Sequence, residues 1–183
     1  MAEQQTTSLT TTNNNCLAIY NPESLRRSLL KVRDISDVLA LNDKTTLALL
    51  RKQQGERKVL AMIKLHLIEL NELLNLKNPL TEKMIDQSAE IICNDFYFLK
   101  MPDIYLIFKR IKTGFWGNFF ESLNIAKVIA CFTDYADERL NLAAEQSANS
   151  ASKEMGRREI FSPASKLSEF TVMYKSKISI KGI

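Results

Sequence analysis

The sequence predicts an all-α protein: a single irregular helical bundle of about five to seven helices, with a disordered N-terminal tail and a mobile basic C-terminal tail. Two observations lead to this prediction. Apolar residues recur at helical spacing through successive segments, and helix-capping residues or Pro, Gly and Asn separate those segments. A chain of 183 residues also suits one domain. We therefore expect a polar tail at 1–20, a helical domain at 21–148 and a basic tail at 149–183.

The first predicted helices are short and begin at capping residues. Asn21 and Pro22 start one, because Asn caps free amides and Pro tolerates the first helical position. A second covers 34–41, and Thr45 or Thr46 starts a third. This succession superficially resembles a helix-turn-helix, but its turn chemistry fixes no recognition geometry, so we favour simple helical packing.

The longest predicted helix covers 56–76. Its apolar residues form so broad an arc that the helix must be buried on more than one side or must pair with a partner helix. Met62, Leu65, Ile68 and Leu73 widen the main stripe. The only histidine, His66, lies among leucines and is expected to be a packing residue, because a lone histidine cannot anchor a multi-histidine metal site.

Three further helices are expected after the long one. Thr81 caps the first, and the apolar connector 96–99 then enters the core. Pro102 lies in the first turn of the second helix, and Ser122 or Asn124 caps the last, which frays near residue 148. The expected ranges of these helices are 81–95, 101–112 and 122–148.

A glycine-aromatic turn at 109–120 separates the last two helices and contains the only tryptophan. Gly114 and Gly117 are expected to set its backbone path, because glycine permits positive φ and close backbone approach. Phe115 and Trp116 can then fold back onto the flanking helices. The turn is either a plain connection whose rings fill the core or a site for a protein partner or nucleic acid.

Three cations, Lys109, Arg110 and Lys112, directly precede the two rings of this turn. Cations at the end of a helix stabilise its dipole. A basic strip beside aromatic rings is also what single-stranded nucleic acid binding needs, since cations contact phosphates and rings contact bases. We expect the rings to share a dry interior and the three cations to remain in water.

The sequence contains no P-loop, dinucleotide fingerprint, metal-ligand set or nucleophile elbow. Its cysteines, Cys16, Cys93 and Cys131, are far apart and are expected to be core side chains. The pattern predicts a non-enzymatic protein with no cofactor and no metal. An acidic cluster on the last helix is expected to lie on a solvated face: Asp134, Asp137 and Glu138.

The chain has no run of about eighteen uncharged apolar residues and no basic-then-apolar N-terminal signal. We therefore expect a cytoplasmic protein without a membrane partner. The formal charge of +4 is concentrated in the C-terminal tail, which can find phosphates by long-range attraction.

Five short motifs follow one another between residues 80 and 145. They are Tyr97-Phe98-Leu99, Pro102-Asp103, Lys109 to Lys112, Gly114-Phe115-Trp116-Gly117 and Tyr135-Ala136-Asp137-Glu138-Arg139. In this order they resemble a family of small helical proteins carried by phages and mobile elements of Bacteroidetes-type bacteria, some of which are similar to phage replisome accessory proteins or helicase loaders.

The resemblance implies an accessory protein of DNA replication in a bacterial host cell, which binds a replicative helicase or another replication protein and contacts DNA. It also implies that the turn packs against Tyr135 and Arg139, with Arg139 bonding turn carbonyls. The alternative is a structural or interaction protein of a phage, such as a virion component or regulator. The expected binding residues are Lys109, Arg110, Lys112, Phe115, Trp116 and Arg139.

Overall fold

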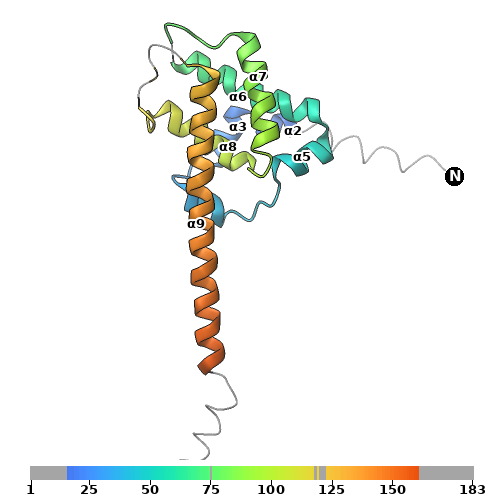
Figure 1. Cartoon of the computed structure of the whole chain (residues 1–183). Coiled ribbons are helices and arrows are strands. Elements are labelled where there is room, and N and C mark those ends of the chain that lie inside the picture. The colour runs from blue at the N-terminus through green and yellow to red at the C-terminus, as the bar shows by residue number, and fades with distance from the viewer. Residues whose placement is uncertain (1–15, 75, 118, 120–122, 161–183) are drawn as a thin grey trace, which may run out of the picture. The chain divides into compact units, whose positions relative to one another are not determined.

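The computed structural model describes residues 16–74, 76–117, 119 and 123–160. The predicted all-α fold is confirmed, and the described part contains eight helices, which Figure 1 follows from blue to red. Residues 1–15 of the predicted N-terminal tail and residues 161–183 of the predicted C-terminal tail lie outside the described residues. The helices are α2 (Cys16–Tyr20), α3 (Pro22–Ser28), α4 (Ile35–Ala40), α5 (Leu47–Gln54), α6 (Glu56–Leu74), α7 (Glu82–Asp95), α8 (Met101–Lys112) and α9 (Ile125–Ile160).

Both ends of the helical region extend beyond the predicted domain. Helix α2 lies inside the stretch predicted as a tail, where Cys16 is buried. Helix α9 continues to Ile160 instead of fraying near residue 148, because no proline interrupts this Ala-, Ser- and Glu-containing stretch. The chain divides into two compact units, residues 1–140 and 141–183. The described part of the second unit, residues 141–160, is helical.

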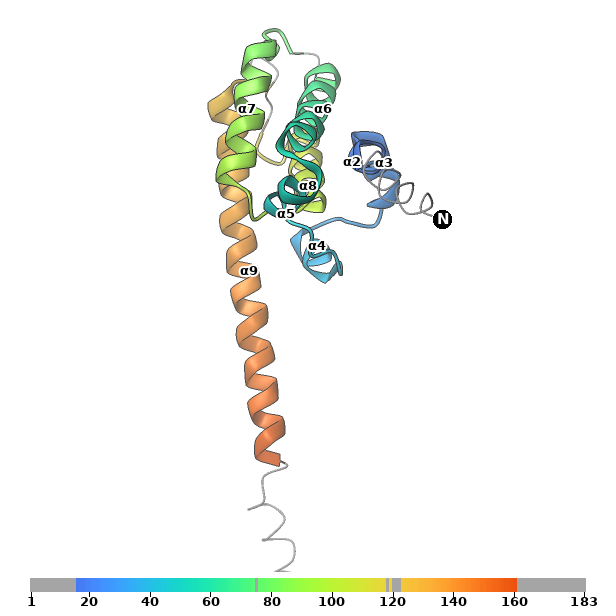
Figure 2. The same ribbon diagram turned by 90° about the vertical axis from the view of Figure 1, so that its right-hand side faces the viewer.

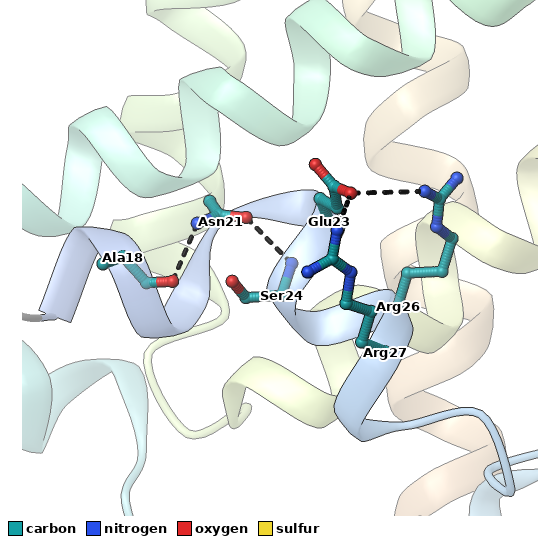
Figure 3. A network of polar contacts seen from close by, with 6 residues as sticks. All are labelled: Ala18, Asn21, Glu23, Ser24, Arg26 and Arg27. Carbon is teal, nitrogen blue, oxygen red and sulfur yellow. Dashed lines mark hydrogen bonds and ion pairs between the residues drawn. The ribbon is translucent and has the colours of Figure 1, made fainter.

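The helix starts follow the capping chemistry of the sequence. At the starts of α3, α5, α7 and α9 a side-chain oxygen accepts a hydrogen bond from a backbone amide of the first turn, which otherwise has no helical partner. Figure 3 shows this contact at the start of α3. The bonds run from Ser24 N to Asn21 Oδ1 (2.8 Å), Leu49 N to Thr46 Oγ1 (3.2 Å), Met84 N to Thr81 Oγ1 (3.3 Å) and Lys127 N to Asn124 Oδ1 (2.9 Å).

Helix α6 lies at the centre of the first unit. It contacts α2, α3, α5, α7 and α8, and Figure 2 shows it beside α7. Ile63, Leu67 and Leu70 are fully buried on it. Apolar burial on one broad face is therefore the main stabilising contribution of this helix, at about 25 cal/mol for each Å² of apolar surface removed from water.

The connector between α7 and α8 is only partly in the core. Phe96 and Leu99 are buried, as predicted, whereas Tyr97 is 54% exposed. The backbone carbonyls of Leu99 and Tyr97 accept hydrogen bonds from Leu47 N (2.8 Å) and Ala48 N (2.9 Å). The connector thereby satisfies amides in the first turn of α5 and ties the start of that helix to residues 97–99.

Candidate functional site

A buried carboxylate joins α8 to the first half of α9. Asp103 lies in the first turn of α8 and has no exposed surface. Its Oδ2 accepts a hydrogen bond from Lys100 N (2.9 Å), which helps to cap α8. Its Oδ1 accepts bonds from the Tyr135 hydroxyl (2.8 Å) and Arg139 Nε (2.8 Å). Burial and the charge of Asp103 raise the pKa of Tyr135, so its hydroxyl remains a donor.

Arg110 forms a second bridge between the same two helices. Its guanidinium donates to both oxygens of Glu138, at 2.5 and 3.2 Å, and its side chain is only 11% exposed. It also lies over two rings, 4.5 Å from the centre of Phe115 and 5.5 Å from the centre of Tyr135. We use the term polar centre for Asp103, Arg110, Tyr135, Glu138 and Arg139.

The prediction that the three cations remain in water is wrong for Arg110, which is buried in the polar centre. Lys109 and Lys112 are half-buried and lie elsewhere: Lys109 Nζ donates to the carbonyl of Val32 (2.7 Å), and Lys112 pairs with Glu69 on α6. Helical phase explains the division, because residues three apart share a face whereas adjacent residues do not.

The turn has the predicted backbone but not the predicted packing. Gly114 and Gly117 have φ values of 75° and 90°, a region that glycine enters without a steric penalty. Phe115, however, is 60% exposed, so the expected dry interior is wrong for this ring. The Phe115 ring is contacted by the Arg110 guanidinium, which also lies over Tyr135. A cation therefore takes the place of the apolar contacts expected for this ring. Trp116 is half-buried and meets Phe115 edge to face.

Arg139 also has a different partner from the one expected. Its Nε donates to Asp103 rather than to a carbonyl of the described turn residues, and Arg110 lies against both Phe115 of the turn and Tyr135. Sequence reasoning placed Asp103 at a helix start but missed its wider role. The available signal was the spacing of Tyr135 and Arg139, which places both on one face of α9. The binding roles of Phe115, Trp116 and Arg139 remain predictions.

His66 packs in the core of α6, as expected. Its ring stacks on Phe108, with 5.6 Å between ring centres and 9° between ring planes, and Nε2 donates to the Tyr20 carbonyl (3.0 Å). Burial lowers the pKa of His66 to about 4, so the ring is neutral at pH 7. It forms part of the wall of a cavity between α3, α6 and α8, which Lys109 and Lys112 also line.

Two buried thiols are poor nucleophiles. Burial raises the pKa of Cys93 and of Cys131 to about 11, so both remain protonated at neutral pH. Among the residues that the structure describes, no three His, Cys, Asp or Glu side chains are grouped to hold a metal ion. None of the helices in the described part of the chain could span a membrane.

No protein-family model matches this chain, and neither the curated proteins nor the solved structures contain a match to it.

Proposed function

We propose that this chain is a non-enzymatic accessory protein of phage or mobile-element DNA replication, which acts as an adaptor for a replicative helicase or another replication protein. The observation that supports this proposal is an exposed apolar pair on the central helix. Leu65 and Ile68 of α6 are 40% and 41% exposed. They are three residues apart and therefore neighbours on the helix surface. We call this pair the α6 face.

The α6 face is suited to a protein partner because its support is rigid. The opposite side of the same helix carries Ile63 and Leu67, both fully buried. A surface that is already ordered loses little conformational entropy on binding. Apolar side chains spaced three residues apart on a helix are a common docking element for a groove in another protein.

The proposal is tested with a double variant, Leu65→Asp and Ile68→Asp. Binding of the purified chain to the replicative helicase of a Bacteroidetes host is measured by isothermal titration calorimetry. We expect at least about a tenfold loss of affinity, because charges would be buried at the centre of the interface. Thermal melts establish that the variant is folded.

Leu30→Asp is the matched control, because Leu30 is 71% exposed and does not lie on α6. Equal losses in both variants would contradict a role for the α6 face. If the unmodified chain does not bind the helicase and instead copurifies with phage particles, the alternative of a structural phage protein is correct.

A further inference from the structure

The cavity between α3, α6 and α8 is small and has aromatic walls. Its volume is about 200 Å³, and Tyr105, Phe108 and His66 contribute to its lining. Sites that enclose a whole drug-sized ligand are larger, about 300–1,000 Å³. This cavity therefore suits one ring of a larger ligand. Because His66 is neutral, the inner wall of the cavity is uncharged.

Cations outnumber carboxylates in the lining of the cavity. Arg26 from α3 and Lys109 and Lys112 from α8 face one carboxylate, Glu69 from α6. The ammonium group of Lys109 has three donors, and its hydrogen bond to the Val32 carbonyl uses one of them. The lining is therefore positive and has donor capacity for an anion beside the space for a ring.

The contacts of Arg26 are easily exchanged for a ligand. Its guanidinium lies 3.9 Å from Glu23, and its side chain is 62% exposed. Figure 3 shows that Arg27 reaches the same carboxylate, so two guanidinium groups share one acceptor. Exposed ion pairs of this kind are weak because solvent screens them. A phosphate can replace Glu23 at Arg26 with little loss.

We propose that this cavity binds single-stranded nucleic acid, with one base inserted between α3, α6 and α8 and the adjacent phosphates on Arg26, Lys109 and Lys112. The inference rests on the proposed role in DNA replication and gives nucleic acid a binding site away from the turn. A single strand carries a phosphate beside every ring, which matches a one-ring cavity with cations from two helices. A duplex base is stacked and paired, so it must be extruded at a cost in free energy before it can enter.

The test uses the purified full chain and a fluorescein-labelled dT20 oligonucleotide, with anisotropy measured at 20 mM to 200 mM NaCl, roughly the range over which phosphate contacts are screened. We expect Arg26→Gln to weaken binding about 5- to 10-fold and to reduce the salt slope by about 0.7, the value for one lost phosphate contact on a single strand. Arg27→Gln is the matched control. It removes a cation from the same helix and the same carboxylate, but Arg27 does not line the cavity. Its expected effect is less than about twofold.

Two further measurements examine the cavity itself. Glu69→Gln removes the carboxylate paired with Lys112, so it should tighten dT20 binding about threefold or more. An abasic oligomer of equal length should bind about tenfold or more weakly, because it has no base to insert.

The proposal is overturned if dT20 does not bind at about 20 mM NaCl, where salt screens the phosphates least. It is also overturned if Arg26→Gln and Arg27→Gln weaken dT20 binding equally. Equal affinity for the abasic oligomer also overturns it. If polyglutamate displaces dT20 as well as unlabelled dT20 does, the occupant is an acidic polypeptide instead. None of these assays contains a helicase. A negative result would therefore overturn the nucleic-acid site without deciding whether the α6 face binds a helicase.

Discussion

Helix α8 contributes to two sites that use charge in opposite ways. In the polar centre, Asp103 has no exposed surface and Arg110 has 11%, and each has partners on α9. At the cavity, Lys112 is 26% exposed and Arg26 is 62% exposed. The first site holds two helices together with satisfied charges. The second carries cations whose contacts can be exchanged.

This difference shows why a run of basic residues cannot be treated as one surface. Lys109 and Lys112 lie on the side of α8 that borders the cavity, whereas Arg110 is rotated by about 100° toward α9. Burial then determines the role of each charge. A buried pair is costly to break because its surviving partner is left without solvent or a counterion, whereas an exposed pair is easily exchanged.

The largest expected effect is at the carboxylate of the polar centre. Asp103→Ala would leave Arg139, whose side chain is 12% exposed, without its ion-pair partner and would also remove the acceptor of the Tyr135 hydroxyl. We expect the free energy of unfolding to fall by about 3–5 kcal/mol. Urea denaturation measures it. The control Asp134→Ala, at an exposed position of α9, should change it by less than about 0.5 kcal/mol.

The free energy of unfolding should depend on pH, because the buried wall of the cavity disfavours a charge on His66. The pKa of His66 is about 4 in the folded chain and about 6.5 when unfolded. Between pH 4 and pH 6.5 the imidazole is protonated in the unfolded state only. The contribution of His66 to the free energy of unfolding is therefore fully present above pH 6.5 and is lost as the pH falls toward 4. The loss reaches about 3 kcal/mol.

Urea denaturation at several pH values, compared with His66→Leu, checks this prediction. The variant has no imidazole to protonate, so its stability should vary less over the same range. Matching pH profiles would mean that water reaches His66, and the contrast between an uncharged wall and cationic neighbours would then be lost.

Substitutions two residues apart test the division of α8 directly. Arg110→Met should lower the free energy of unfolding by about 2–4 kcal/mol, because Glu138 loses a two-bond partner and two rings lose a cation. Lys112→Met should cost about 1 kcal/mol or less, since the Lys112 side chain is 26% exposed whereas that of Arg110 is 11% exposed. Similar losses in the two variants would show that burial does not separate the sites.

Most of the fold followed from the sequence because its signals are local. Capping by Asn21, Thr46 and Thr81 depends on neighbouring residues, as does the positive φ of the turn glycines. The partners of Arg110 and Lys112 could not be read in this way. They come from residues 28 and 43 positions away, on helices whose relative rotation is set by packing. The cavity was equally hidden, because it exists only where α3, α6 and α8 meet.

The smallest expected effect on stability is at Glu69, and its sign differs between the two properties measured. Glu69→Gln keeps the shape of the side chain and leaves Lys112 partly in water, so the free energy of unfolding should fall by no more than about 1 kcal/mol. Affinity for dT20 should rise in the same variant, because Lys112 is released and the lining becomes more positive.

Glu138→Gln is the counterpart in the polar centre. It should lower the free energy of unfolding more than Glu69→Gln does, since Arg110 is buried, and it should leave dT20 binding unchanged. Thermal melts and anisotropy on both variants separate a charge that holds the fold from one that restrains a binding site. If Glu69→Gln destabilised the chain as much as Glu138→Gln did, and bound dT20 no better, the cations at the cavity would be structural like Arg110.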